Sequence, residues 1–323
     1  MSITSYAGAS DTGRKRRRNE DSYVIAPPIF AVADGMGGAQ AGEIASKLAA
    51  AALEDTDPGS KSGAERVTSL IQEANRRVHE RAIADPATSG MGTTMTVALV
   101  EGKTVTFGHV GDSRAYRYRD GGIEQITEDH SLVNELLKSG KLSPEEADTH
   151  PQRSVITRAV GTDPDVDVDA FTIDAEVGDV FLICSDGLTD MVDDEDIRSV
   201  LEKFHNDLDR ATKSLVSAAN RGGGEDNITV VAFAISEDGA GAETARMPAV
   251  DEDTMENIPA PKVDTMVVPP EDVEHVFVEP GSPEAAAVTR REPISPAARV
   301  RLVLIMLILL AVAAVLLVWG LVR

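Results

Sequence analysis

A short apolar strand that ends in an aspartate and three glycines constrains this chain more than any other feature. Residues 29–33 form an apolar run that predicts a buried strand, and Asp34 stands where it ends. Three glycines follow within four residues, so the backbone there can turn sharply and approach a ligand closely. A carboxylate beside free main-chain carbonyls suits a hard cation such as Mg²⁺ or Mn²⁺. The stretch 32–38 therefore predicts a turn that can hold a metal ion.

Three further aspartates lie at the ends of predicted strands. Asp186 ends another apolar run, Asp129 follows a strand and Asp226 begins one. Asp190 comes four residues after Asp186, and a helical turn would bring the two to one side. Carboxylates gathered in this way repel one another unless cations neutralise them. Two hard metal ions about 3.5–4 Å apart would offset that repulsion, hold a bridging hydroxide and clamp a phosphoryl group.

The spacing of apolar residues predicts helices followed by a series of antiparallel strands. Predicted helices cover residues 41–53, 64–84, 132–139, 194–204 and 208–221, and predicted strands cover residues 3–9, 22–26, 29–33, 91–100, 104–110, 115–119, 123–127, 180–184 and 228–235. Short turns join neighbouring strands, so we expect layers of an α+β fold and not a parallel βαβ array. The mixed insert 142–160 is a candidate mobile flap. Alternating aspartates from 163 to 169 predict a strand with one wet face, since a calcium loop would need a glycine at its sixth position.

Composition limits the classes of partner and the compartment. The formal net charge is -23, which repels nucleic acid and attracts cations. The single cysteine, Cys184, cannot form an internal disulfide, and this favours a reducing compartment. The first residues carry no apolar run of the kind found in a signal peptide. Five consecutive basic residues, 14–18, are followed at once by acids, so we expect one arginine to bind phosphate and the others to face solvent.

Three other kinds of enzyme that act on phosphoryl groups, namely cysteine phosphatases, aspartyl phosphotransferases and NTPases, do not fit the sequence. A cysteine phosphatase needs an arginine six residues after its cysteine, and Asp190 stands there after Cys184. No aspartate opens the D-x-D-x-[TV] pattern of aspartyl phosphotransferases. The sequence also contains no G-x-x-x-x-G-K-[ST] phosphate loop, so an NTPase is unsupported.

Seven motifs in order resemble those of the metal-dependent Ser/Thr protein phosphatases of type 2C, in their short bacterial form. They are R-R-R-N-E-D-S (16–22), V-A-D-G-M-G-G (32–38), G-T-T (92–94), G-D-S-R (111–114), T-E-D-H-S (127–131), C-S-D-G-L-T-D (184–190) and G-E-D-N (224–227). The resemblance spans residues 1–236, and it implies a four-layer α-β-β-α sandwich of two antiparallel sheets flanked by helices. It also implies two Mn²⁺ or Mg²⁺ ions at one end of the sheets, and a third, weaker ion.

The resemblance also implies the role of each site residue. The first metal would be held by Asp34, Asp186 and Asp226. The second would be held by Asp34 and the carbonyl of Gly35, with Glu20 or Asp21 reaching it through water. The third would be held by Asp129 with Asp186 or Asp190, and Arg16 would bind the phosphate. Many relatives have a histidine where this chain has Met36, and that histidine is thought to protonate the leaving group. Met36 cannot do so, which leaves water on a metal, or no dedicated acid, for that role.

The resemblance leaves three functions open. The first is a phosphatase that hydrolyses phosphoserine and phosphothreonine on proteins by attack of a metal-bridging hydroxide, and so opposes Ser/Thr kinases. The second is a phosphatase dedicated to one regulator, such as an anti-sigma antagonist. The third is an inactive scaffold that binds phosphoproteins, which the complete set of acids disfavours. We expect a monomer whose partners are phosphorylated proteins and kinases.

The C-terminal third differs in composition from the rest. Residues 237–301 are rich in Pro, Ala, Glu and Asp and predict a disordered linker. Residues 302–322 form an uninterrupted apolar run that predicts one transmembrane helix. Four arginines lie between 290 and 301 and only Arg323 follows, so the positive-inside rule places the catalytic domain in the cytoplasm. The sequence therefore predicts a single-pass protein of the cell membrane.

Overall fold

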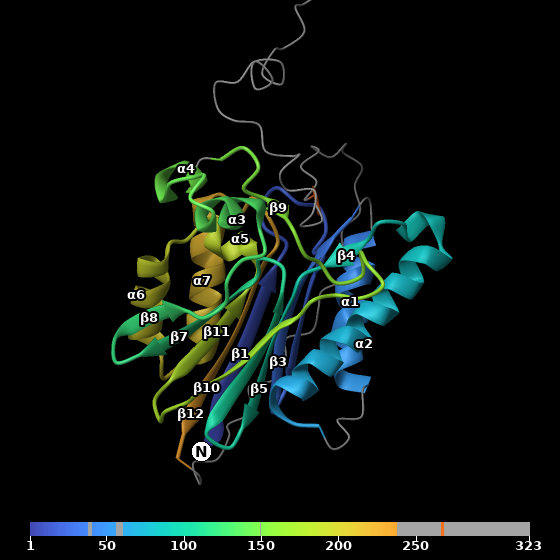
Figure 1. Ribbon diagram of the computed structural model, residues 1–323. Helices are drawn as coiled ribbons and strands as arrows, with labels where there is room; N and C mark the ends of the chain where they lie inside the picture. The colour runs from blue at the N-terminus through green and yellow to red at the C-terminus, as the bar shows by residue number, and fades with distance from the viewer. Residues whose placement is uncertain (38–40, 56–60, 149, 238–265, 268–323) are drawn as a thin grey trace, which may run out of the picture. The chain divides into compact units, whose positions relative to one another are not determined.

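The computed structural model describes residues 1–37, 41–55, 61–148, 150–237 and 266–267 (Figure 1). Its strands are β1 (Ser2–Asp11), β2 (Asp21–Ala26), β3 (Ile29–Met36), β4 (Gly92–Thr93), β5 (Met95–Glu101), β6 (Thr104–Val110), β7 (Arg114–Arg119), β8 (Gly122–Gln125), β9 (Val155–Ile156), β10 (Asp169–Asp174), β11 (Val180–Cys184), β12 (Ile228–Ser236) and β13 (Met266–Val267). Its helices are α1 (Ala41–Asp55), α2 (Gly63–Ala84), α3 (Leu132–Lys138), α4 (Pro144–Asp148), α5 (Asp186–Thr189), α6 (Asp194–Phe204) and α7 (Leu208–Gly222), with a short 3-10 turn at Pro86–Thr88.

Strand β3 is apolar on both faces because it is covered on both. Ile29 and Ala31 belong to a core that includes α1 and α2, whereas Phe30 and Val32 belong to a second core between the sheets. Successive side chains of a strand point to opposite faces, so a strand covered twice has no polar alternation. The apolar run that the sequence displays at this point is therefore the mark of a central strand.

Two antiparallel sheets face each other across a core of phenylalanines. One sheet has the order β1-β12-β11-β7-β8, and the other β10-β6-β5-β3-β2, with β4 paired to β3. Phe30 stacks on Phe233 with ring centroids 4.3 Å apart, and Phe181 lies 5.2 Å from Phe233. Since Phe30 comes from one sheet and the other two from the second, these rings join the sheets.

Helices cover the outer face of each sheet, which completes four layers (Figure 1). Helices α1 and α2 pack on the sheet of β3, and α6 and α7 pack on the sheet of β12. Figure 1 shows the two helix pairs on opposite sides of the strands. The expected α-β-β-α sandwich of two antiparallel sheets is confirmed.

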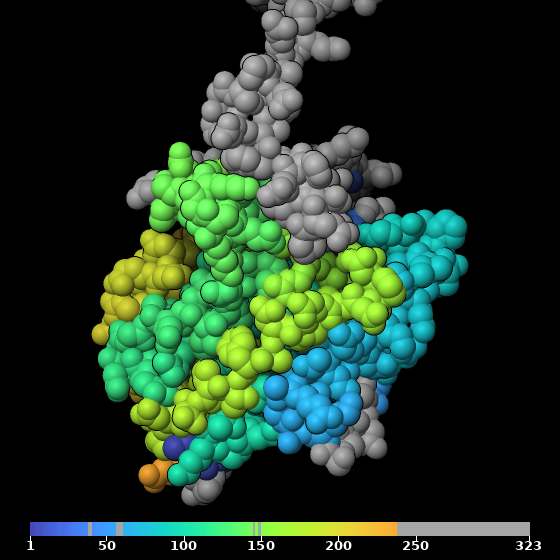
Figure 2. All heavy atoms as spheres, viewed as in Figure 1, coloured from blue at the N-terminus to red at the C-terminus, as the bar shows by residue number. Residues whose placement is uncertain are grey.

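The alternating aspartates were expected to form a strand, and this prediction is wrong. Only Asp169 lies in a strand, at the start of β10, while residues 163–168 form turns and irregular chain. Pro164 has no N–H for a ladder, and the side chain of Asn75 in α2 donates to the carbonyls of Asp163 and Pro164 at 3.0 and 3.1 Å. Figure 2 shows this yellow-green stretch lying across the face of the molecule beside α2. Strand β10, an edge of its sheet, was not predicted.

The predicted flap insert contains two short elements joined to the body. Helix α4 begins at the expected Pro144, and β9 follows it. Ser131 caps α3 as expected, because its hydroxyl accepts a hydrogen bond from the N–H of Asn134 at 3.3 Å.

Most of the predicted tail lies outside the described residues. That applies to the apolar run 302–322 and to the linker except for Glu237 and β13. Among the residues that the structure does describe, no helix has both the length and the apolar character needed to cross a membrane.

Candidate active site

Asp34 lies near the end of β3, and hydroxyl groups hold its backbone. The N–H of Asp34 donates to Thr94 Oγ1 at 3.0 Å, and its carbonyl accepts from Thr93 Oγ1 at 2.7 Å. Thr94 Oγ1 also lies 2.7 Å from Ser113 Oγ. These threonines are buried, so the carboxylate of Asp34 is presented from a fixed backbone.

Gly35 must be glycine because two other segments pass against its α-carbon. A Cβ atom there would lie 2.1 Å from the carbonyl oxygen of Gly42 and 2.5 Å from that of Glu20. Its N–H donates to the carbonyl of Glu20 at 3.2 Å. The start of α1 and the residue before β2 therefore both close on the strand end that carries Asp34.

Asp186 opens the single-turn helix α5 directly after β11. Its Oδ1 atom is buried and has no hydrogen-bond partner. Burial, and then the negative charges of Asp112 and Asp226, raise the pKa of Asp186 well above its ordinary value. Asp190 ends the same turn, its N–H donating to the carbonyl of Asp186 at 2.8 Å, as the four-residue spacing predicts.

Asp226 approaches from the turn before β12 and meets Arg16 from the basic loop. Arg16 Nη2 donates to Asp226 Oδ2 at 2.7 Å. Asn227, the next residue, donates from its side chain to the carbonyls of Thr12 and Arg18 at 2.9 and 2.8 Å. Because Asn227 binds both ends of the basic loop, Arg16 is held beside the acids while remaining partly exposed.

Glu20 and Asp21 lie on the chain entering β2, opposite Asp34. Asp21 is paired in register with Asp34 across the β2–β3 ladder. Ser185 Oγ donates to Asp21 Oδ2 at 2.9 Å, but Asp21 Oδ1 is buried without a partner. Burial raises the pKa of Asp21 to about 6 and that of Glu20 to about 7, although the nearby Arg16 lowers the latter.

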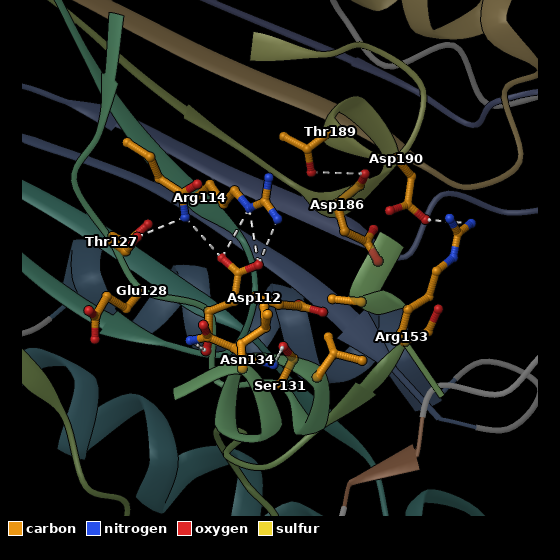
Figure 3. Close-up of a pocket in the computed structure, with 16 residues that line it drawn as sticks. Asp112, Arg114, Thr127, Glu128, Ser131, Asn134, Arg153, Asp186, Thr189 and Asp190 are labelled. Carbon is orange, nitrogen blue, oxygen red and sulfur yellow. Dashed lines mark hydrogen bonds and ion pairs between the residues drawn. The ribbon is translucent and has the colours of Figure 1, made fainter. Parts of the chain in front are cut away.

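A pocket of about 600 Å³ opens beside this cluster (Figure 3). Its lining includes the acids Asp112, Asp129, Asp186 and Asp190, and Arg153 from the flap insert. Figure 3 shows the side chains of Asp190 and Arg153 pointing toward each other at one edge of the pocket. Their Oδ2 and Nη2 atoms are 3.4 Å apart.

Asp129 and Asp112 differ in how their charge is balanced. Both oxygens of Asp129 accept hydrogen bonds from Arg114, at 2.8 Å from Nη2 and 3.0 and 3.1 Å from Nε. Asp112 has no such cation, and burial, followed by the charge of Asp129, raises its pKa to about 7. The assignment of Asp129 to a third metal stays a prediction, and Asp112 is a second candidate for that role.

Asp112 lies in the G-D-S-R motif (111–114), but no function was predicted for it from the sequence. The available signal was its position, because Asp112 follows the apolar strand β6 just as Asp34 and Asp186 end or follow theirs. The predicted acids Asp34, Asp186 and Asp226 form one group in the structure. Besides burial, the charges of Asp186 and Asp226 raise the pKa of Asp34, and all three acids raise the pKa of Arg16. Glu20 and Asp21 adjoin this group.

The donor set fits hard divalent cations. All candidate ligands are oxygens, and the orphaned Oδ1 atoms of Asp21 and Asp186 are buried acceptors that need a positive partner. Burial and the charges of Asp21, Asp186 and Asp226 raise the pKa of Asp34 well above its usual range. In the described part of the chain no three His, Cys, Asp or Glu side chains stand, as they are placed, so that they could together hold a metal ion. The acids lie close enough to raise one another's pKa, and their oxygens are of the type that hard cations bind.

Comparison with known proteins agrees with this geometry. The family model described as Protein phosphatase 2C matches residues 15–219. Serine/threonine protein phosphatase PstP of Mycobacterium tuberculosis is 41% identical over 232 residues, covering 71% of this chain and 44% of that protein. Serine/threonine phosphatase stp of Listeria monocytogenes is 39% identical over 233 residues, covering 69% of this chain and 92% of that protein. The match thus spans under half of the mycobacterial relative and nearly all of the listerial one.

Solved structures show the same fold at similar identity. The crystal structure of the M. tuberculosis phosphatase PstP/Ppp has a TM-score of 0.69 at 39% identity, covering 73% of this chain and all of that one (100%). The catalytic domain of PstP in complex with two manganese ions has a TM-score of 0.66 at 37% identity, covering 73% of this chain and 99% of the other.

Proposed function

Because the chain belongs to the protein phosphatase 2C family, we propose that it is a metal-dependent phosphatase that removes phosphate from phosphoserine and phosphothreonine in proteins. The observation that carries this proposal is the group of buried and half-buried carboxylates at the strand ends, two of which have a buried oxygen without a partner. Such a group is costly in a cation-free protein and is suited to holding hard cations. Its substrates would be the products of Ser/Thr kinases, which the names of the relatives support.

We assign two Mn²⁺ or Mg²⁺ ions to this group, with a weaker third. One ion would be held by Asp34, Asp186 and Asp226. The second would be held by Asp34 and the Gly35 carbonyl, with Glu20 or Asp21 acting through water. The third would be held by Asp129 or Asp112 together with Asp186 or Asp190. When bound, the cations supply a strong nucleophile at neutral pH and neutralise charge on the phosphoryl group. The manganese ions bound to the related PstP catalytic domain support this assignment.

The side chains of this chain bind and orient the substrate. Arg16 is partly exposed beside Asp226, and its planar guanidinium can donate two hydrogen bonds to a phosphate that enters from solvent. Thr93 and Thr94 fix the backbone of Asp34, so the carboxylate need not reorganise during the reaction. Met36 carries no acidic proton, so water on a metal, or no dedicated acid, would serve the leaving alkoxide.

The location we propose follows from sequence. The apolar run 302–322 would anchor the protein in the cell membrane with the catalytic domain on the cytoplasmic side. The acidic linker would let that domain meet kinases and their substrates near the membrane.

The direct test of the function is hydrolysis of a phosphothreonine peptide by the purified full-length chain in detergent. We expect phosphate release with Mn²⁺ and none in excess EDTA, and a loss of at least a hundredfold in Asp34→Ala. The remote Asp207→Ala, which removes only the N-cap of α7, serves as the control and should keep wild-type turnover. Equal rates with and without EDTA, or a fully active Asp34→Ala, would refute the proposal.

A further inference from the structure

Strand β9 in the flap insert has an edge that takes up another segment of chain. On one side Ile156 bridges to Ser131, and the N–H of Thr157 donates to the carbonyl of His130 at 2.8 Å. On the other side β13 lies parallel to β9, with Met266 opposite Val155 and Val267 opposite Ile156. An edge strand binds extended peptides through main-chain hydrogen bonds, so β9 is a ready docking strand.

This edge lies next to the candidate active site. Arg153 and Ser154, the two residues before β9, line the pocket, and Arg153 reaches Asp190. Ile156 is fully buried and packs with Met36, which comes two residues after Asp34. A segment that occupies β9 therefore lies beside the rim of the pocket and on the strand that packs against Met36, the last residue of β3.

We propose that the segment containing Met266–Val267 docks in cis on β9 and competes there with peptide substrates, which use the same edge. The inference rests on the proposed function, because it concerns the substrates of that site. It assigns β9 as the strand to which an extended phosphopeptide adds its main chain, next to the pocket that receives the phosphorylated residue.

The sequence around β13 suits a short strand. Met266, Val267 and Val268 favour extended backbone, and Pro269-Pro270 ends main-chain pairing because proline has no N–H. The triplet Asp253-Thr254-Met255 repeats Asp264-Thr265-Met266. It is followed by Glu256-Asn257, whereas two valines follow Met266. Residues 253–257 therefore provide a control segment that shares the triplet but lacks the β-favouring valines.

The tether makes weak docking sufficient. Residues 238–265 connect the last residue described after β12 to β13. A flexible linker of this length has a root-mean-square span of ~30 Å. Such a tether gives an effective concentration of ~1 mM, so a segment with a dissociation constant of ~0.1 mM would be mostly bound.

Kinetics of full-length variants in detergent test the competition. Met266→Pro with Val267→Pro removes both main-chain donors of β13, and Met255→Pro with Glu256→Pro is the matched control. We expect the first variant to lower KM for a phosphothreonine peptide by roughly threefold to tenfold. The control should keep the wild-type KM, and kcat/KM for p-nitrophenyl phosphate, which has no peptide chain, should agree within twofold in all three proteins. Unchanged peptide KM in an active enzyme would overturn the docking proposal, whereas no metal-dependent release by any of the proteins would defeat the proposed function itself.

A disulfide trap tests the register without reference to activity. Neighbouring strands lie about 4.8 Å apart, within the Cα separation that a disulfide accepts. The natural Cys184 is fully buried and does not interfere. Under mild oxidation, Val155→Cys with Met266→Cys should crosslink at least fivefold more than Val155→Cys with Met255→Cys. Equal yields would contradict the pairing.

Discussion

At the scale of single residues, buried hydroxyl groups determine how Asp34 is presented. Thr94 Oγ1 accepts from the Asp34 N–H and contacts Ser113, the neighbour of Asp112. A buried polar contact of this kind adds little net stability compared with apolar packing, but it fixes geometry. The G-T-T motif therefore matters because its side chains hold the backbone of the aspartate to which we assign a metal ion.

Thr94→Val should lower kcat/KM for p-nitrophenyl phosphate by roughly 10–100-fold, the usual cost of losing a group that orients a metal ligand. Thr94→Ser keeps the hydroxyl and should remain within about threefold of wild type. Thr106→Val is the matched control, because Thr106 is equally buried and bonds Thr172 at 2.9 Å far from the acids. If Thr94→Val and Thr106→Val have equal kinetics, Thr94 does not position Asp34.

Asp112 and Asp129 should respond differently to loss of charge. Asp112→Asn removes a half-buried carboxylate that forms no ion pair among the described residues and whose pKa is raised, so turnover should fall at least tenfold while the metal-free protein gains stability. Asp129→Asn leaves Arg114 without its bidentate partner and should cost about 1.5–3 kcal/mol of unfolding free energy. Urea denaturation and steady-state kinetics of the two variants distinguish these outcomes. A reversed pattern would assign the catalytic role to Asp129.

At the scale of secondary-structure elements, strand ends bring together acids from distant parts of the sequence. Strands β3, β6 and β11 each carry or precede an aspartate at the same end of the sandwich, and the turn before β12 adds another. Burial raises the pKa of Asp112 and Glu20 to about 7 and of Asp21 to about 6. In the cation-free protein these groups take up protons near neutral pH.

The stabilisation by Mn²⁺ should therefore be larger at pH 8 than at pH 6. A raised carboxyl pKa means that the folded state binds more protons than the unfolded state, so stability without cations falls as pH rises from about 4 to 7. Cations bind the ionised acids, and at pH 6 they must displace protons. The buried His109, whose pKa is lowered to about 3, contributes with and without Mn²⁺ and cancels. Thermal unfolding in EDTA and in Mn²⁺ at both pH values checks this, and an equal or smaller shift at pH 8 would contradict it.

Sequence patterns predicted the strands whose faces are buried by the neighbouring layers. They failed where contacts with a distant part of the chain determine the backbone conformation. The runs of β3, β11 and β12 are apolar because both faces are buried, so their positions were predictable. The stretch before β10 follows the side chains of α2, which no local pattern reveals. The site acids were predictable from strand ends and motifs. The Arg114–Asp129 pair was not, because it joins the start of β7 to the irregular chain after β8, fifteen residues further on.

At the scale of the whole molecule, the charge of -23 and the C-terminal apolar run are the two features that bear on partners and location. The negative field disfavours nucleic acid and favours cations. Residues 302–322 contain no charge and lie outside the described residues, so their role as an anchor is a prediction from sequence.

Protease added to intact spheroplasts should leave the catalytic domain uncut, and lysis should expose it. If residues 302–322 span the membrane, the four arginines before them would place that domain in the cytoplasm by the positive-inside rule. A periplasmic marker protein that is digested in the same sample shows that the protease reached the outer surface. Digestion of the domain without lysis, or recovery of the full-length chain in the soluble fraction, would overturn the topology.

Anomalous diffraction at the manganese edge, from crystals of residues 1–236 grown with Mn²⁺, tests the metal centre most directly. Related catalytic domains of this extent have been crystallised, and both sheets of this chain end within it. We expect two strong anomalous peaks, one contacted by Asp34, Asp186 and Asp226 and the other by Asp34 and the Gly35 carbonyl. Both peaks should vanish in Asp34→Ala crystals. Wild-type crystals with no peak beside Asp34, or with manganese bound elsewhere only, would contradict the account.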